Sequence, residues 1–422
     1  MTDQIITYEE LAFPHFRNTR SIGSLSGVNL TTEDALRAAL VTRSNIFAVG
    51  GRGTGKTQAL SDILRHFFGG EGEDGKGVFI EGSPDFKSAE LFTRVNLDKV
   101  FDPSKRAATT DEIIELTSKI NKRFFGADEL NRCPEITQNG FMGMASGYYV
   151  HPNGTRIPLG NNEYSIAMAT ANIGNGEYSG TFRMDSAGLD RWQLILDLNY
   201  WRKTPEDENE IKRQRRDPRV KLAPLRDLSD KLVAAYKSIG QPSESMELIS
   251  LYLTQGLDYC EKFPAAEHSK RVLDTRFPVI CHEKSCALRN TACGIAKPLE
   301  ERGAQTILRL AQGLEYIAKL KNPEAGEDPI NSMLIAYSLV APHSRVLSLQ
   351  YILQEENFNN PALAGKKAAV KLRQEIEALQ KADSPVFQAY MQAKQGGSRA
   401  GIDALPAKYE YLKPFLKEAT RA

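Results

Sequence analysis

One run of residues constrains the fold of this sequence more than any other, because the letters GGRGTGKT at positions 50–57 fit GxxxxGK(S/T) at every fixed position. A short apolar run that starts at Ser44 precedes it, and a helical pattern over residues 58–68 follows it. A buried strand, a glycine turn and a helix in that order form a phosphate-binding loop, because backbone N–H groups and the helix N-terminus then surround an anion. We therefore expect nucleotide contacts from Gly50, Gly51, Arg52, Gly53, Thr54, Gly55, Lys56 and Thr57.

Two acids follow a later apolar run, FFGA, and suggest a metal and a base beside this loop. Asp128 and Glu129 come directly after FFGA, where a strand is expected to end. In a phosphate-loop protein that uses ATP, Lys56 reaches the outer phosphates, and Thr57 and the first acid hold Mg²⁺. The second acid then polarises the attacking water. The alternative interpretation of the pair is a solvated strand end.

The apolar and polar patterns predict an α/β core followed by helices. A parallel sheet is expected because strands alternate with helices. The expected strands cover residues 44–51, 76–82, 123–129 and 164–172, and a fifth lies within 190–198. Helices are expected from Thr31 onward, over 58–68 and over 88–97. From residue 228 the patterns are helical, over 228–239, 244–263, 303–320, 330–342 and 366–381.

These patterns divide the chain into five expected segments. They are an irregular lead over 1–30, an α/β nucleotide-binding core over 31–200, a charged connector over 201–227, a helical lid domain over 228–357 and a helical C-terminal extension over 358–422. The connector carries dense charges of both signs. A solvated helix or linker is one interpretation, and a contact with nucleic acid or another subunit is the other.

Charge and hydropathy exclude several classes of protein. The 54 basic and 53 acidic residues leave a net charge of +1, which excludes a polycation that coats nucleic acid. Apolar runs fall far short of the ~20 residues that span a bilayer. The first residues carry Asp3, Glu9 and Glu10 where a secretory signal is basic and then apolar. We therefore expect a cytoplasmic protein without a membrane segment.

Four short stretches resemble the MoxR-type AAA+ ATPases. They are ADELNRCP at 127–134 with EITQ at 135–138, ATAN at 169–172 and LDRW at 189–192. Their order and spacing agree with that family over about residues 30–200, although Trp192 stands where the family usually has Phe. The resemblance implies an AAA+ core with a helical lid and ATP hydrolysis between the subunits of a ring, expected to be a homo-hexamer. It also implies a protein substrate that is remodelled, and a von Willebrand A-domain partner.

The resemblance also suggests roles for three further polar residues. Asn172 matches the sensor-1 asparagine, whose carboxamide aligns the attacking water; an ordinary strand-end asparagine is the alternative. Arg191 looks like the arginine finger that reaches a neighbouring subunit's nucleotide, with Arg183 as a second candidate and a structural ion pair as the alternative. Arg302 resembles the sensor-2 arginine of the lid, or else begins a solvated helix.

A hairpin signature separates the acids from Asn172. Residues 148–151 and 155–159 flank Pro-Asn-Gly, which favours a tight turn between two strands. The position matches the pre-sensor-1 hairpin of the same family, so Tyr149, His151 and Arg156 are candidates for gripping a threaded partner. A plain structural hairpin is the alternative.

Four of the five cysteines lie close together in the sequence. Cys260, Cys281, Cys286 and Cys293 fall within one stretch that also holds His268 and His282, whereas Cys133 lies apart. Thiolates and imidazoles are preferred Zn²⁺ ligands, so a zinc site is one interpretation. The spacing lacks the CxxC pairs of zinc ribbons, so free buried thiols and an iron–sulfur cluster stay open.

Three function hypotheses remain from the sequence. The first is a MoxR-like ATPase that remodels a protein partner. The second is a nucleic-acid motor or clamp loader that uses the hairpin and the basic stretch 212–221. The third is a scaffold that binds ATP without turnover. The near-neutral charge and the MoxR-like stretches favour the first over the second, and the intact acid pair disfavours the third.

Overall fold

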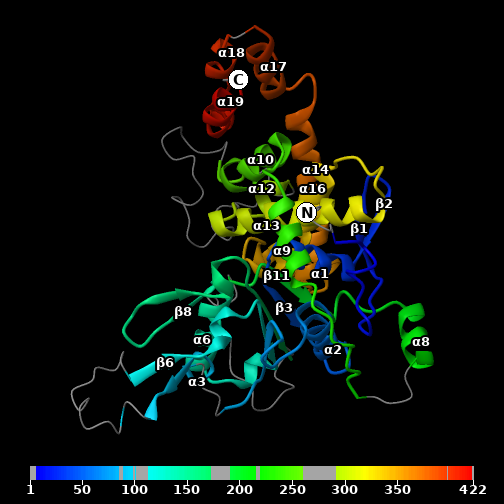
Figure 1. Ribbon diagram of the computed structural model, residues 1–422. Coiled ribbons are helices and arrows are strands. Elements are labelled where there is room, and N and C mark those ends of the chain that lie inside the picture. Colours follow the sequence, from blue (N-terminus) through cyan, green and yellow to red (C-terminus); the bar gives the residue numbers. More distant parts are fainter. Residues whose placement is uncertain are drawn as a thin grey trace. The chain divides into compact units, whose positions relative to one another are not determined.

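The computed structural model describes residues 6–84, 89–97, 100, 113–172, 191–214, 219–259, 291–396 and 398–420 (Figure 1). The chain forms two compact units. The first comprises Met1–Ser21 and Thr31–Ile239, and the second comprises Ile22–Leu30 and Gly240–Ala422. The helix around residues 229–238, which the sequence patterns grouped with the helices after it, therefore belongs to the first unit. In the described residues, no helix is both long enough and apolar enough to cross a membrane.

The first unit is built on a five-stranded parallel sheet, as the sequence patterns predict. Its strands are β3 (Ile46–Val49), β4 (Gly77–Glu81), β7 (Phe124–Asp128), β10 (Ile166–Ala171) and β11 (Leu194–Asp197). They lie in the order β11-β3-β10-β7-β4, and all neighbours pair in parallel. Strand β10 pairs with β3 on one side and β7 on the other. The carboxyl ends of these three strands therefore meet at one edge of the sheet, where ligands of open α/β sheets bind.

Helices and aromatic packing hold this sheet. The helices of the first unit include α1 (Thr32–Val41), α2 (Lys56–Asp62) with the π-helical turn η1 (Ile63–Phe67), α6 (Glu135–Ala145), α8 (Pro205–Gln214) and α9 (Ser229–Ser238). Helix α1 begins with a capping box between Thr31 and Asp34. In the core, the buried Trp192 stacks on Phe47 with ring centroids 5.4 Å apart. The indole of Trp192 thus packs in the core, at a position where the family that the sequence resembles usually has phenylalanine.

One helix predicted in the first unit is replaced by other structure, and the expected connector contains the helix α8 and is held by hydrogen bonds. The predicted helix over 88–97 is wrong: α3 (Ala89–Phe92) gives way to β5 (Thr93–Val95), which pairs antiparallel with β6 (Ile114–Leu116). The β-branched residues of Thr-Arg-Val favour a strand, and Arg94 forms an ion pair with Glu115 across it. The connector is tied to the unit, because the buried Asp207 accepts hydrogen bonds from the backbone N–H groups of Thr19 and Thr204.

In its described residues, the second unit is helical apart from one small sheet. Its helices are α10 (Glu244–Leu251) with the π-helical turn η6 (Tyr252–Gly256), α12 (Ala292–Ile295), α13 (Glu301–Lys321), α14 (Pro329–Val340), α15 (Leu349–Ile352), α16 (Pro361–Gln380), α17 (Pro385–Gly396), α18 (Ala400–Asp403) and α19 (Lys413–Ala419), with the 3₁₀ turns η9 (Ala341–His343), η10 (Glu355–Asn357) and η11 (Ala407–Leu412). Helix α14 is buried along almost its whole length and packs against both α13 and α16.

The expected irregular lead contains a two-stranded sheet instead. Strands β1 (Ser21–Leu25) and β2 (Val28–Thr31) pair with each other. Gly23 lies so close to α14 that a Cβ atom there would stand 2.6 Å from Cδ1 of Ile335. The backbone N–H of Ser26 donates to Asp328 at 3.1 Å. The glycine and serine residues of this run therefore permit close contact rather than disorder.

Candidate nucleotide-binding site

The loop predicted to bind phosphate lies between β3 and α2. Gly53 and Gly55 have φ angles of +75° and +99°, a region that glycine adopts without strain. Lys56 is buried, and its Nζ donates to the carbonyl oxygens of Gly50 at 2.8 Å and Gly51 at 2.7 Å. Burial lowers the pKa of Lys56, while the charges of Asp128 and Glu129 oppose that shift. The Lys56 ammonium group is thus held by neutral carbonyl oxygens of the loop, and phosphate oxygens could take their place as acceptors.

Hydroxyl and carboxylate oxygens meet beside this loop. The Thr57 hydroxyl on α2 donates to the carboxylate of Asp128 at 3.0 Å and 3.1 Å, at the end of β7. Hard oxygen donors of this kind are the ligands that Mg²⁺ prefers. The two residues that the sequence assigns to the metal therefore lie together, and their chemistry fits Mg²⁺.

Thr170 is a residue of this site that sequence reasoning missed. Its hydroxyl, fully buried on β10, donates to Asp128 Oδ1 at 2.6 Å and accepts from the backbone N–H of Glu129 at 2.9 Å. One side chain of the central strand thereby fixes both acids. The only signal in the sequence was a hydroxyl residue within an apolar strand next to Asn172.

Both carboxylate oxygens of Glu129 are engaged. Oε1 accepts from Nδ2 of Asn172 at 2.9 Å, and Oε2 lies 2.9 Å from Nε of Arg132. Glu129 has a φ angle of +52°, which costs a non-glycine residue on the order of 1 kcal/mol or more. Asn172 therefore lies where the sequence places it. Arg132, which is half-exposed, was not foreseen, and it occupies one lone-pair position of Oε2.

The lead and the connector support α2 from outside the loop. Asp62 accepts hydrogen bonds from the backbone N–H groups of His15 at 2.7 Å and Phe16 at 2.6 Å. Gln58 exchanges two hydrogen bonds with the backbone of Lys221, at 2.8 Å and 3.0 Å. Burial raises the pKa of Asp62, and its hydrogen bonds oppose that shift. Segments on either side of the core in sequence therefore hold the helix that follows the loop.

The loop itself is supported by the segment after β11. Asn199 Oδ1 accepts from the backbone N–H of Gly51 at 2.9 Å, and Lys203 Nζ lies 3.4 Å from the carbonyl oxygen of Gly53. A Cβ atom on Gly55 would stand 3.2 Å from that ammonium nitrogen and 3.3 Å from the ring of Phe16. Gly55 is therefore required both by its φ angle and by this close approach.

Arg191 lies at the opposite edge of the sheet from the loop. Its carbonyl oxygen accepts a hydrogen bond from Asn45, the residue before β3, and its Nε donates to Ser146 at 3.2 Å. The loop begins at Gly50, after β3 ends, and five residues of extended chain cover roughly 16 Å. An arginine side chain does not span that distance. Arg191 is thus separated from the phosphate loop of its own chain.

Other predicted site residues are placed elsewhere or not described. Arg302 begins α13 in the second unit and is exposed. Cys293 is half-buried on α12, and Cys133 is buried near the acids, where burial raises the pKa of its thiol. Arg183, Cys260, Cys281 and Cys286 lie outside the described residues. Within the part of the chain that is described, no three metal-ligating side chains come together.

The predicted hairpin is present as β8 (Tyr148–Val150) and β9 (Arg156–Pro158), paired antiparallel. Two of its three candidate gripping residues face inward: Tyr149 packs on Phe92 with centroids 4.9 Å apart, and His151 is only 7% exposed. Arg156 is exposed, with its guanidinium 4.9 Å from the centroid of the Tyr148 ring. The inward orientation of Tyr149 and His151 corrects the expectation for those two residues.

Comparisons with known proteins give no family assignment. Neither the protein-family models nor the curated proteins include a match. The structure is similar to that of a presumed ATPase from Cytophaga hutchinsonii, with 19% identity, a TM-score of 0.49 and coverage of 82% of this chain and 87% of that one. It is also similar to a full-length MCM homologue from Methanopyrus kandleri, with 15% identity, a TM-score of 0.44 and coverage of 79% and 59%. Likeness at this level assigns no activity, so the function has to come from the side chains of the site.

Proposed function

We propose that this chain is an AAA+ ATPase of the MoxR-like kind, which hydrolyses ATP in a ring of its own copies to remodel a protein partner. The observation that carries the proposal is the cluster at the carboxyl edge of three adjacent strands. There the phosphate loop, the Thr57–Asp128 pair and the Glu129–Asn172 pair lie side by side. Phosphoryl transfer to water needs these parts: a phosphate cradle, oxygen ligands for a cation, and a base with an orienting amide.

Each residue has a defined task in this proposal. Lys56 leaves the loop carbonyls and binds the outer phosphates, which its pairing with neutral acceptors allows. Thr57 and Asp128 hold Mg²⁺, which supplies charge neutralisation at the phosphates when bound. Glu129 accepts the proton of the attacking water once Arg132 releases Oε2, and Asn172 orients that water. The side chain of Thr170 holds the Asp128 carboxylate and the backbone of Glu129 in position relative to each other.

The position of Arg191 supports the proposed ring. A finger at the amino edge of the sheet is separated from its own loop, so we propose that it stabilises the transition-state charge at a neighbouring subunit's site. Arg302 is proposed as the residue of the helical unit that responds to nucleotide. A hexamer, a von Willebrand A-domain partner and a cytoplasmic location belong to the same proposal through the sequence resemblance.

Mixing variants tests the trans arrangement. Arg191→Ala subunits keep an intact phosphate loop and lack the finger, whereas Lys56→Ala subunits keep the finger and lack the loop lysine. Each variant alone should be inactive, and mixtures should recover part of the ATP hydrolysis, with the maximum at intermediate ratios. Absence of recovery at every ratio would mean that each site is completed within one chain.

The same assay distinguishes a protein remodeller from a nucleic-acid motor. Steady-state ATP hydrolysis should be unchanged by single-stranded DNA, double-stranded DNA or RNA, because the chain has a near-neutral charge. Stimulation by any of the three would replace the protein partner with nucleic acid. Binding without hydrolysis would favour a scaffold.

A further inference from the structure

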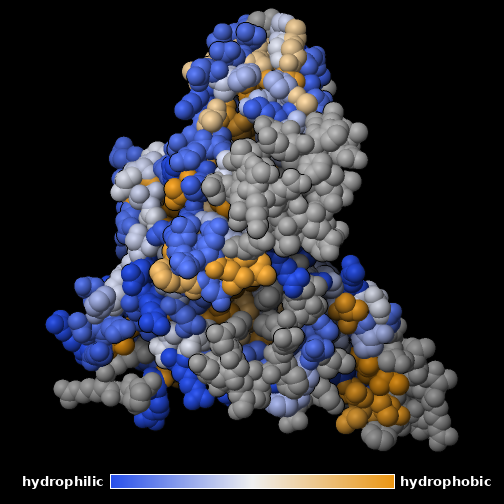
Figure 2. Space-filling view, turned by 180° about the vertical axis from the view of Figure 1, so that it is seen from behind, coloured by the Kyte–Doolittle hydropathy of each residue, from blue (hydrophilic) through white to orange (hydrophobic). Residues whose placement is uncertain are grey.

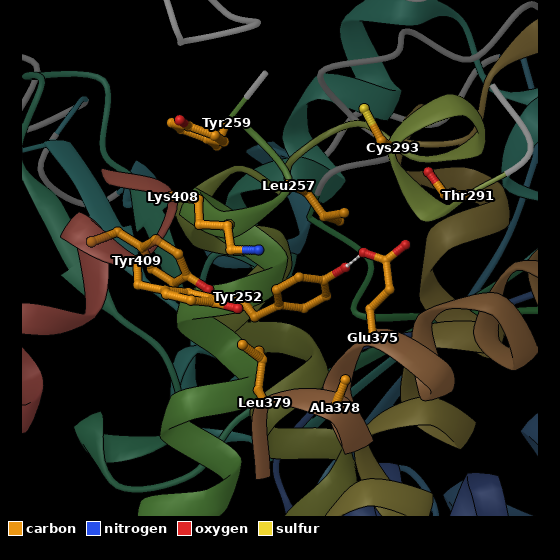
Figure 3. A pocket seen from close by; sticks show the side chains of 12 residues that line it. Tyr252, Leu257, Tyr259, Thr291, Cys293, Glu375, Ala378, Leu379, Lys408 and Tyr409 are labelled. Atoms are coloured by element: carbon orange, nitrogen blue, oxygen red, sulfur yellow. Dashed lines mark hydrogen bonds between the residues drawn. The ribbon is translucent and has the colours of Figure 1, made fainter. Parts of the chain in front are cut away.

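The second unit contains a cavity that the proposed ATPase does not use. Its volume is about 290 Å³, and the elements around it are η6, the start of α12, α16 and η11 (Figure 3). Ligand pockets range over about 300–1,000 Å³, so this cavity suits a small group rather than a nucleotide. All of its lining residues belong to the second unit, so the cavity is independent of the phosphate loop.

Tyrosine side chains line much of the cavity. Tyr252 and Tyr259 come from η6 and the residues after it, and Tyr409 and Tyr411 come from η11. Burial raises the pKa of both Tyr252 and Tyr411 above the ordinary value, so both phenols stay protonated. A tyrosine ring carries a negative π-face, which attracts a cation that reaches it.

The backbone at η6 is adapted to this arrangement. Tyr252 to Gly256 form a π-helical turn, a feature that often marks functional positions. A Cβ atom on Gly256 would stand 2.7 Å from the hydroxyl oxygen of Tyr411. Glycine at this position therefore lets the phenol of η11 approach the helical backbone.

One carboxylate faces the tyrosines and is held in place. Glu375 on α16 accepts a hydrogen bond from the Tyr252 hydroxyl on one oxygen and from the backbone N–H of Ala292 on the other, at 3.0 Å (Figure 3). A carboxylate has about four lone-pair sites, so each oxygen retains capacity for a further donor or a cation. Glu375 is thus oriented by rigid groups.

Lys408 brings a positive charge to one of these rings. Glu375 and Lys408 are the two charged side chains among the described residues of the lining. The exposed Lys408 places its Nζ 5.0 Å from the centroid of the Tyr409 ring, and Figure 3 shows its ammonium end directed toward the cavity. A tyrosine of the cavity therefore already contacts an ammonium group from this chain, on a flexible side chain that can turn to solvent.

We propose that this cavity binds an organic ammonium ion, of the size of a trimethylammonium group, between the tyrosine rings and Glu375, in competition with Lys408. The same chemistry is offered by a small free molecule such as choline and by a methylated lysine side chain of a partner protein.

The test measures binding of choline to the full chain by calorimetry and ligand-observed NMR, with 3,3-dimethyl-1-butanol as the neutral control of equal shape. Choline should bind and the neutral analogue should not. Glu375→Gln should weaken choline binding about tenfold, since it removes the charge opposite the ligand. Lys408→Met should strengthen it about threefold or more, because it removes both a competitor and a like charge. Lys319→Met, an exposed lysine of α13, is the matched control and should change nothing.

The sign of the Lys408→Met effect makes the proposal falsifiable even if Glu375→Gln perturbs folding, because Lys408 is exposed. Loss of choline binding in Lys408→Met would show that the Lys408 side chain forms part of the binding surface rather than competing with the ligand, and would overturn the proposal. Equal binding of the neutral analogue, or no choline binding to either wild type or Lys408→Met, would also overturn it. A peptide with trimethyllysine that binds more tightly than choline would support a protein side chain as the source, and the reverse order a free molecule.

Discussion

The phosphate-loop edge of the first unit and the cavity of the second unit both hold a glutamate between two hydrogen-bond donors. Glu129 lies between the Asn172 amide and the half-exposed Arg132, whereas Glu375 lies between a buried tyrosine and a backbone N–H. An arginine at the surface can turn away and free a carboxylate oxygen, but a buried phenol and a backbone group cannot. The difference suggests that Glu129 acts as a base whose Oε2 becomes free when Arg132 moves, whereas Glu375 provides a fixed negative charge for binding.

The first unit also exposes apolar side chains. Figure 2 shows apolar residues gathered at the lower right of the view. Exposed side chains on and next to the β5–β6 hairpin include Val95, Leu97 and Leu116. The two glutamates, in contrast, are enclosed by polar partners, so each has a local chemical environment that can be altered by a single substitution.

Apart from substitution of the proposed base itself, the largest expected effect comes from the Thr170 hydroxyl, which joins the two acids. Thr170→Val keeps the shape of the side chain but removes the hydrogen bonds to Asp128 and to the N–H of Glu129. We expect kcat for ATP hydrolysis to fall about 10- to 30-fold, equivalent to about 1.4–2 kcal/mol, with a smaller change in KM. Thr42→Val, which removes a buried hydroxyl at the end of α1, is the control and should leave kcat unchanged. A wild-type kcat in Thr170→Val would show that the acids are positioned without this residue.

Much of this site could be predicted because its parts are contiguous in the sequence. A glycine loop after one strand and acids at the end of another are local patterns, and the parallel sheet brings them together. Arg132 and Thr170 could not be predicted in the same way, because a single arginine or threonine has no spacing that marks its role. The helix predicted over 88–97 failed for a similar reason, since pairing with β6 depends on a segment further along the chain.

The cavity of the second unit could not be predicted at all. Tyr252, Glu375 and Tyr409 are far apart in the sequence and meet only through helix packing. The helical character of this unit was readable from the periodicity of apolar residues, but periodicity does not reveal which side chains face each other. The lead was misread because β1 and β2 are short and rich in glycine and serine, and their order depends on contacts with α14.

The next largest effect is expected from Tyr252, whose hydroxyl helps to fix the position of Glu375. Tyr252→Phe removes the hydroxyl that donates to Glu375 and leaves the rest of the ring. We expect the free energy of unfolding of the second unit to fall by about 1–2 kcal/mol, because a carboxylate loses one donor but stays partly exposed to water. Urea unfolding followed by fluorescence measures this change. Unchanged stability would mean that Glu375 is held by the Ala292 N–H alone.

The smallest expected effect concerns Asp62, which ties the lead to α2. Burial raises the pKa of Asp62, so folding takes up a proton between the pKa of the unfolded chain and that of the folded one. Asp62 therefore contributes stability that is present below the unfolded pKa and is lost as pH rises through the folded pKa. An asparagine side chain at this position cannot titrate in this way. At neutral pH, the free energy of unfolding of Asp62→Asn should therefore differ from that of wild type by about 1 kcal/mol or less.

The free energy of unfolding of wild type should rise relative to that of Asp62→Asn as the pH falls from about 7 to about 4. Urea midpoints of wild type and Asp62→Asn at matched pH values measure the difference directly. A shift in the opposite direction would mean that the hydrogen bonds from His15 and Phe16 outweigh burial.

The most direct test of the account is ATP turnover by Glu129→Gln beside a control acid at the same edge of the sheet. Glu81 ends β4, pairs in register with Asp128 and is exposed, so Glu81→Gln makes the same chemical change one strand away. Glu129→Gln should bind ATP within about threefold of wild type and hydrolyse it at least about 100-fold more slowly, because an amide cannot accept the proton of the attacking water. Glu81→Gln should hydrolyse ATP at the wild-type rate. Wild-type turnover by Glu129→Gln would contradict the assignment of Glu129 as the base, and with it the proposed mechanism.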